Sequence, residues 1–156
     1  MSVPIFLVRH GEAGMAATDA ERALTERGRA HVGMIAQRFA KRFEIGSLKI
    51  LASPLVRAQE TAQIWNQTLG QNLPIEIEPM IVPEGNVVRF ARLLESQDSA
   101  LLVVSHFPFV PALASYLISG QKDRVSIAVP TGTVITLVPE GEPGHPGSYQ
   151  LLGIDN

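Results

Sequence analysis

The sequence predicts an α/β protein, a three-layer sandwich with a mostly parallel central sheet flanked by helices. Two observations support this prediction. Short apolar runs of strand length alternate along the chain with segments in which apolar residues repeat at helical spacing, as in layered α/β folds. The runs at residues 5–8 and 100–104 contain no polar residue, which is typical of strands that helices cover on both faces of a parallel sheet.

The size and charge of the chain narrow the range of functions. Its 156 residues, 46% hydrophobic and 18% charged, predict a single domain over residues 1–156. The formal net charge of −2 provides no clustered basic surface for a nucleic acid. We therefore expect no DNA or RNA partner.

The cysteine content and the N-terminal residues indicate the cellular compartment in which the protein is expected to lie. The chain has no cysteine, which excludes disulfides, a thiolate nucleophile and a thiolate metal site, and suits a reducing environment. No basic segment precedes the first apolar run, and no apolar stretch approaches membrane-spanning length. We expect a cytoplasmic protein with no membrane partner.

The first structural unit is a strand, a loop and a helix. The run at 5–8 is the strand, and the small and polar residues of 14–22 form the loop. Thr25 is expected to cap the helix, with Glu26 favourably placed in its first turn. The helix should reach about Phe43, because apolar residues repeat at helical spacing. These residues are Val32, Ile35, Ala36, Phe39 and Phe43.

The second unit repeats this order. Residues 48–52 are predicted to form a short strand, followed by a helix with Ser53 as its N-cap and Pro54 in its first turn. Gly70 is expected to close that helix. The stretch 73–79 alternates apolar and acidic residues between prolines, which favours a short edge strand.

The remainder of the chain continues the alternation and ends in two strands. Residues 100–104 are the clearest central strand, and a helix is expected to start at 105–108. The last two strands follow, joined by an exposed loop rich in proline and glycine. The other predicted segments are the turn 82–86, the helix 87–94, the strands 133–138 and 149–152, and the loop 139–147.

Polar side chains suited to chemistry follow three of these strands. Arg9 and His10 follow the first strand. Ser53 and Arg57 follow the second, and His106 follows the central strand. In parallel sheets, ligands bind outside the carboxyl ends of the strands. We therefore expect these side chains to meet at one edge of the sheet and to form one site.

The residue types at the first strand end favour an anionic oxygen cluster as the ligand. The guanidinium of Arg9 offers a planar fork of donors that matches phosphate. Gly11 can take a positive φ and would let a ligand approach the main chain closely. The prediction is a phosphate site. The alternative is a strand end whose polar residues only cap the sheet.

Two other chemistries, metal binding and serine catalysis, are compatible with single residues of the expected site but not with all of them together. A metal would face the positive charges of Arg9 and Arg57, so no metal or other cofactor is expected. Ser53 and Ser105 lack the flanking glycines of a nucleophile elbow, and they are better interpreted as helix caps or phosphate ligands. The side chains that could have supplied metal ligands are His10, Glu12, Asp19 and His106.

Three ordered motifs resemble those of a known family. Residues 9–12 (Arg-His-Gly-Glu) resemble the opening signature of the histidine phosphatase superfamily, also called the phosphoglycerate mutase-like proteins. Residues 53–62 are similar to its second motif, and residues 105–106 to the motif of its second histidine. Within the family, residues 19–25 and 105–110 are most similar to the short SixA-type phosphohistidine phosphatases.

The resemblance implies a role for each residue of the site. His10 would be the nucleophile, which attacks phosphorus and becomes phosphorylated. The resemblance also implies no metal. The groups implied to bind and stabilise the transferring phosphoryl group are Arg9, Arg57, His106, Gly11 and Ser53.

The sequence departs from the family pattern at two positions. Ala23 stands where a proline is expected before residues 24–25, which is a small change in loop stiffness. Asn86 stands where relatives carry an aspartate, which leaves the general acid open. Glu84, two residues earlier, is our expectation for that role, and Asp19 in the first loop is its competitor.

The implied activity is hydrolysis of a phosphorylated substrate through a phosphohistidine enzyme intermediate. Related mutases and small-molecule phosphatases carry extra segments over the site, and this chain has only short connections. An open site suits protein phosphohistidine on a phosphorelay domain as substrate, and a broad or small-molecule phosphomonoesterase is the alternative. Two readings from other classes are a non-catalytic phosphohistidine-binding module and a domain kept for assembly alone.

Overall fold

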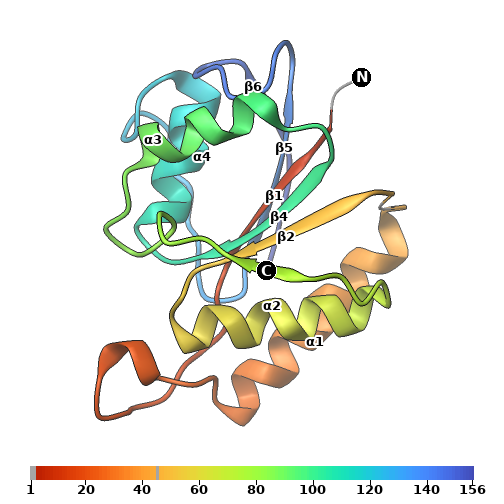
Figure 1. The fold of residues 1–156 in the computed structure, drawn as a ribbon, viewed down its shortest axis with the longest axis vertical. Helices are drawn as coiled ribbons and strands as arrows, with labels where there is room; N and C mark the ends of the chain where they lie inside the picture. The colour runs from red at the N-terminus through yellow and green to blue at the C-terminus, as the bar shows by residue number, and fades with distance from the viewer. Residues whose placement is uncertain (1–2, 45) are drawn as a thin grey trace.

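The computed structural model describes residues 3–44 and 46–156. Strands and helices alternate along the described chain, as the sequence predicts (Figure 1). The strands are β1 (Ile5–Arg9), β2 (Leu48–Ala52), β3 (Ile75–Ile77), β4 (Ala100–Ser105), β5 (Val134–Pro139) and β6 (Tyr149–Asp155). The helices are α1 (Glu26–Arg42), α2 (Val56–Leu69), α3 (Val87–Leu93) and α4 (Phe109–Ser119), with short 3-10 turns η1 (Asp19–Glu21) and η2 (Leu94–Ser96).

The sheet has six strands in the order β3-β2-β4-β1-β5-β6. Strands β1 to β4 pair in parallel, while β5 and β6 join antiparallel at one side. Helices α1 and α2 lie on one face of the sheet, and α3 and α4 lie on the other (Figure 1). The predicted three-layer α/β sandwich with a mostly parallel sheet is confirmed.

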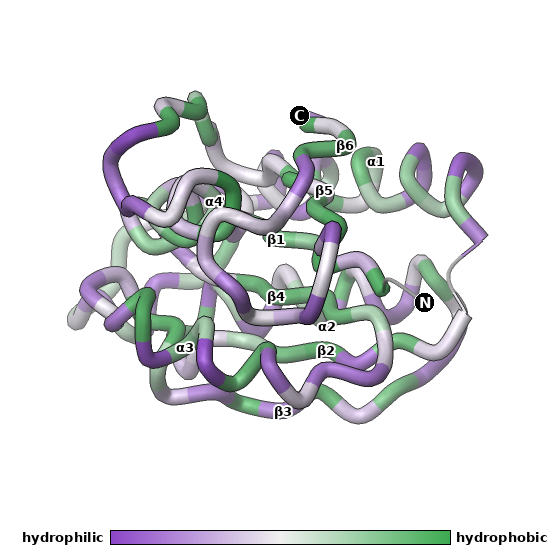
Figure 2. The backbone as a smooth tube through the Cα atoms, turned by 90° about the horizontal axis from the view of Figure 1, so that it is seen from above, coloured by the Kyte–Doolittle hydropathy of each residue, from purple (hydrophilic) through white to green (hydrophobic). Residues whose placement is uncertain are grey.

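The core consists of two apolar clusters, one on each face of the sheet. Successive residues of a strand point to opposite faces, so Leu7 packs with the cluster of α3 and α4, and Phe6 with that of α1 and α2. Trp65 of α2 is fully buried in the second cluster. Viewed from above, apolar residues dominate the central strands β1, β4 and β2 (Figure 2). This double burial explains why these strands contain so few polar residues.

The start of α2 differs from the prediction. The helix begins at Val56 with Leu55 as its N-cap residue, so the assignment of Ser53 as N-cap is wrong. The predicted cap of α1 is confirmed, because the Thr25 side chain accepts a hydrogen bond from the Gly28 N–H. The difference arises because two further residues separate Ser53 from the helix, which places Ser53 at the strand end instead. In the described residues, no helix has both the length and the apolar character to cross a membrane.

Candidate active site

The carboxyl ends of β1, β2 and β4 lie side by side at one edge of the sheet. The parallel registers pair Arg9 with Ser105 and Ala52 with Val104. The residues that follow these strands therefore meet. The ring centroids of His10 and His106 are 5.1 Å apart, and the Arg57 Nε lies 3.4 Å from the His10 Nε2.

The ring of His10 is held with its Nε2 facing Arg57, whose Nε donates a hydrogen bond to it. Its Nδ1 lies 2.7 Å from the carbonyl oxygen of Gly11. A carbonyl can only accept a hydrogen bond, so Nδ1 carries the proton and Nε2 carries the lone pair in the neutral ring. Because Arg57 faces this Nε2, an electron pair and a positive charge lie next to each other.

The surroundings keep His10 neutral. The pKa of His10 is lowered to about 4, mainly because the ring is buried. The hydrogen bond to Gly11 opposes this shift, while the positive charges of Arg57, Arg9 and Arg22 add to it. At neutral pH the ring is therefore an unprotonated base, which is the form that can attack phosphorus.

Arg57 lies in the first turn of α2 and is 4% exposed. Its NH1 donates to the main-chain oxygen of Asp19 at 2.8 Å, and its NH2 to the Asp19 carboxylate at 3.1 Å. Thr61, one turn later, ties this helix to the first strand end. The Thr61 hydroxyl donates to the Arg57 carbonyl at 2.8 Å and accepts from the Gly11 N–H at 3.0 Å.

Arg9 is the last residue of β1 and reaches across to two other segments. Its NH1 donates to the carbonyl of Val129 at 2.8 Å. Its guanidinium carbon lies 5.6 Å from the centroid of the Phe107 ring, a distance suited to a cation–π contact. Burial lowers the pKa of Arg9, and the charge of Arg57 adds to the effect. The arginine stays protonated, because its usual pKa is far above neutral.

His106 lies deeper than His10, with an exposed fraction of 1%. Burial, followed by the proximity of His10 and Arg57, lowers the pKa of His106 to about 3. Its Nε2 is 2.7 Å from the Ser53 Oγ. The His106 Nδ1 and the Arg9 Nε are buried and have no hydrogen-bond partner among the residues that the structure describes. Buried polar atoms are normally paired, so these two nitrogens have unused hydrogen-bonding capacity.

Asp19, one of the two candidates for the general acid, lies at the rim of this site. Asp19 binds Arg57 and also Arg22, whose NH1 lies 3.1 Å from the Asp19 Oδ1. The hydrogen bonds from Arg22 and then Arg57 lower the pKa of Asp19. Asp19 is thus held as a carboxylate, which accepts protons poorly and has none to donate. This electrostatic setting disfavours it as an acid.

Glu84 lies exposed on the turn between Ile81 and α3. A Cβ on Gly85 would meet the Met80 carbonyl at 2.1 Å and the Phe109 ring at 3.1 Å, so the turn packs closely against the start of α4. Asn86 caps α3, with its side chain accepting from the Arg89 N–H. The acid role of Glu84 stays a prediction.

Two residues expected to bind phosphate have other contacts. Gly11 has no positive φ, and its N–H already donates to Thr61. Gly11 is needed because a Cβ would lie 2.6 Å from the Val32 side chain. Ser53 is fully buried and bonded to His106. Gly11 therefore does not use the positive φ open to glycine, and the phosphate-binding roles of Gly11 and Ser53 stay predictions.

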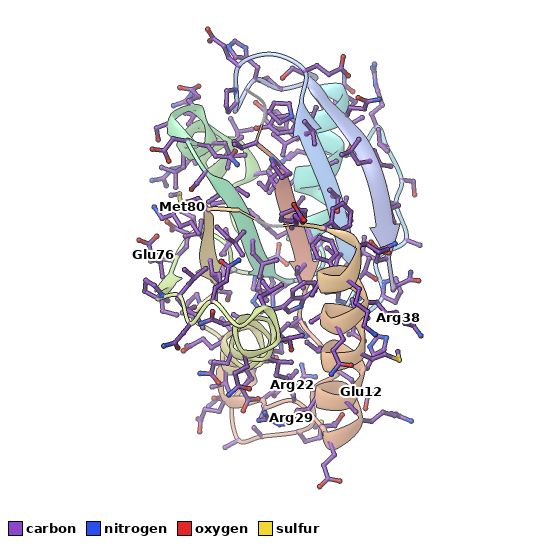
Figure 3. All side chains as sticks on the ribbon, turned by 90° about the vertical axis from the view of Figure 1, so that its right-hand side faces the viewer. Glu12, Arg22, Arg29, Arg38, Glu76 and Met80 are labelled. Atoms are coloured by element: carbon purple, nitrogen blue, oxygen red, sulfur yellow. The ribbon has the colours of Figure 1, made fainter. Side chains whose placement is uncertain are left out.

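Sequence reasoning missed three contributors to the site. Thr61 lies one helical turn after Arg57, and its spacing within a buried helix face could have identified it. Arg22 reaches back through its Nε to the carbonyl of Gly14 at 2.8 Å. In Figure 3, Arg22 lies at the same end of the molecule as Glu12. The third contributor is the main-chain carbonyl of Val129, which accepts a hydrogen bond from the Arg9 side chain. No sequence motif would reveal a contact made by a main-chain oxygen.

The side chains that the sequence offers as metal ligands have other partners in the structure. Among residues 3–44 and 46–156, no group of three or more histidine, cysteine, aspartate or glutamate side chains is placed to hold a metal ion. The four ligands that the sequence offered are divided, since Glu12 binds Arg27 at 2.9 Å and Asp19 binds Arg57 and Arg22.

A neutral histidine facing an arginine, beside a second buried histidine at the carboxyl edge of an α/β sheet, is an arrangement suited to phosphoryl transfer. A family model described as the histidine phosphatase superfamily (branch 1) matches residues 5–82. The chain belongs to this superfamily. The match includes His10 and Arg57, and the resemblance predicted from the motifs is confirmed.

Individual members of the superfamily are similar to most of this chain. Phosphohistidine phosphatase SixA of Escherichia coli strain K12 is 30% identical over 122 residues, 75% of each protein. A SixA homolog of Haemophilus influenzae is 35% identical over 133 residues, covering 78% of this chain and 80% of that protein. The solved structure of the protein histidine phosphatase SixA complexed with tungstate superposes with a TM-score of 0.82 at 26% identity, covering 99% of this chain and 97% of that one.

Proposed function

We propose that the protein hydrolyses phosphohistidine on a partner protein through a phosphorylated His10. One observation carries this proposal: the His10 Nε2 carries the lone pair of a buried neutral ring, and the Arg57 Nε donates a hydrogen bond to it at 3.4 Å. A nucleophile without a positive charge beside it would repel an anionic phosphoryl group. Here the electron pair of His10 and the positive charge of Arg57 lie next to each other.

The reaction proceeds in two displacements. The Nε2 of His10 forms a bond to phosphorus while the bond from phosphorus to the substrate's imidazole nitrogen breaks, and that nitrogen takes up a proton. Water then attacks phosphorus, and the Nε2 of His10 leaves with its electron pair, so inorganic phosphate is released. In both steps charge accumulates on the equatorial oxygens. The groups placed to stabilise that charge are Arg9, Arg57 and His106.

The partner is inferred from the relatives and from the shape of the chain. Relatives named phosphohistidine phosphatases match three quarters or more of the sequence. The connections from β2 to α2 and from β4 to α4 are short, and the longer connection from β1 to α1 contacts Arg57 through Asp19. We propose a phosphorelay domain that displays phosphohistidine as the substrate, with a small phosphomonoester as the alternative.

Rapid quench under alkaline conditions tests the proposal. The protein is mixed with a phosphohistidine-bearing protein, and acid-labile phosphate should be found on His10 by mass spectrometry. Release of phosphate should continue in a chelator. His10→Gln should abolish both, whereas the matched control His145→Gln, on the loop between β5 and β6, should retain both. Full phosphate release by His10→Gln would contradict the proposal.

A further inference from the structure

Ser53 is held rigidly behind the second histidine. It follows β2, where its N–H donates to the Val104 carbonyl at 3.0 Å. The residue is fully buried. Its Oγ lies 2.7 Å from the His106 Nε2. Neither a helix cap nor an open phosphate ligand describes this position, because the hydroxyl faces the ring of the histidine.

The partners of the hydroxyl determine which atom donates. A serine hydroxyl has one proton to donate and two lone pairs that accept. The Ser53 Oγ accepts from the Leu55 N–H at 3.2 Å. Among the described residues its other partner is the His106 Nε2. The hydroxyl proton therefore has one available acceptor, and that acceptor is the ring nitrogen.

The opposite arrangement leaves more groups unpaired. If Nε2 of His106 carried the proton and donated to Ser53, the buried hydroxyl proton would have no acceptor among the described residues. The buried Nδ1 of His106 would also be a bare lone pair. If the ring proton is on Nδ1, the Ser53 hydroxyl donates to Nε2, and the Nδ1 N–H is the single group of this pair without a partner among the described residues. Buried unpaired groups are costly, so the count favours the second arrangement.

We propose that Ser53 is a positioning residue that fixes the tautomer of His106, with the Ser53 hydroxyl donating to Nε2 and the ring proton on Nδ1. The inference rests on the proposed function for its catalytic consequence. A protonated Nδ1 is a hydrogen-bond donor to phosphate oxygens, whereas an unprotonated Nδ1 would present a lone pair to those anionic oxygens and repel them. Ser53 thereby decides whether the neutral His106 attracts or repels the transferring group.

The tautomer can be measured without any substrate. Long-range proton–nitrogen correlation spectra of protein labelled with 15N-histidine distinguish protonated from unprotonated ring nitrogens. The chain has four histidines, and a His106→Gln sample assigns the signals of His106. At pH 7 we expect a protonated Nδ1 and an unprotonated Nε2. A protonated Nε2 in the wild type would overturn the proposal.

Removing the hydroxyl should move the tautomer and slow turnover together. In Ser53→Ala the His106 signals should shift toward protonation at Nε2. The kcat on a phosphohistidine peptide should fall about 10- to 100-fold with little change in KM, by analogy with groups that orient metal-binding histidines. Ser53→Cys keeps the approximate size of the side chain and a weak hydrogen-bond donor. Its kcat should therefore lie between that of the wild type and that of Ser53→Ala. Unchanged kcat in both variants would overturn the catalytic consequence.

A matched control separates this effect from the loss of any buried serine. Ser115 of α4 is also fully buried, and its hydroxyl donates to the Gln121 carbonyl at 2.6 Å. Ser115→Ala should leave the His106 signals and kcat unchanged. If the wild type releases no phosphate, the proposed function fails, while the spectra of the wild type and of Ser53→Ala still decide the role of Ser53. If Ser53→Ala does not fold, Ser53→Cys gives the same comparison.

Discussion

The interior of the site and its rim differ in what shifts their charges. His10, Arg57 and His106 form the interior and are 7%, 4% and 1% exposed. Burial is the main cause of the lowered pKa of both histidines there. At the rim, the Asp19 side chain is 64% exposed, and hydrogen bonds rather than burial lower the pKa of its carboxylate.

This difference indicates which residues should stabilise the transition state most. Charges in a buried, water-excluded site interact strongly, and donors already in place need no reorganisation during the reaction. Exposed ion pairs contribute little, because water and salt screen them. Substitutions should therefore cost less and less from the interior toward the rim, and the following predictions test that order.

Arg57→Ala should cause the largest loss among these variants. Removing one charge-stabilising donor costs about 2.7–4 kcal/mol in activation free energy, about 10²–10³ in kcat. Stability should fall only modestly, since the side-chain partners of Arg57 are the exposed Asp19 loop and His10. Steady-state kinetics and thermal unfolding measure the two effects. The control is Arg27→Ala, which breaks an exposed pair with Glu12.

A folded Arg57→Ala protein with wild-type turnover would make Arg57 structural. It would also remove the proposed contrast between interior and rim, because a buried cation would then contribute no more than an exposed one.

The pH dependence should report the burial of His10. Its pKa in the folded protein is about 4, so the nucleophile stays neutral down to that pH. We expect kcat/KM to be level through pH 6.5 on its acid side and to fall about tenfold per unit only below pH 4. A fall centred near 6.5, the ordinary pKa of histidine, would show that His10 is not desolvated as the structure indicates.

The pH dependence of the free energy of unfolding should also reflect His10 and His106. Their pKa values are lower in the folded protein than in the unfolded chain, so the unfolded state binds more protons between pH 6.5 and about pH 4. The free energy of unfolding is therefore highest above pH 6.5. It should fall as the pH drops, by about 1.4 kcal/mol per unit for each histidine. Urea unfolding at pH 7 and pH 5 measures this slope, and His106→Gln should reduce it.

The convergence of the strand ends could be predicted from the sequence alone. Apolar runs such as 100–104 identify buried strands, and parallel strands end at a common edge. Polar residues directly after these strands, such as His10 and His106, must then be neighbours. The prediction succeeds because it needs only the period of the strands and the direction of the chain.

The contacts behind these residues could not be predicted in this way. The contact of Ser53 with His106 joins residues 53 positions apart, and nothing in either motif specifies which atom of a residue faces which. The Cβ restriction at Gly11 arises from Val32 on another element. The pairing of Asp19 with Arg57 depends on how the first loop folds back over α2. Such details depend on packing between elements, which local pattern does not encode.

Asp19→Asn tests the rim from the electrostatic side. The amide keeps an oxygen that can accept a hydrogen bond from Arg57 and loses the charge. Because exposed ion pairs contribute about 0–1 kcal/mol, we expect kcat to fall less than about fivefold. A general acid would be worth about 10²–10⁴-fold, so a loss of that size would assign the acid role to Asp19. Turnover on a phosphohistidine protein, with Glu12→Gln as the control for an exposed pair, measures the difference.

Glu84→Gln should have the smallest effect on phosphohistidine and a larger one on phosphate esters. An alkoxide leaving group needs a positioned proton donor, whereas the ring nitrogen of a leaving imidazole can be protonated before its bond to phosphorus breaks. Asn86, which caps α3, carries no acidic proton, so Glu84 is the proposed donor. Kinetics of wild type and Glu84→Gln on a phosphohistidine peptide and on an alkyl phosphate monoester give the comparison. Equal losses on both substrates would exclude Glu84 as the acid, and rapid ester hydrolysis by the wild type would favour a broad phosphomonoesterase.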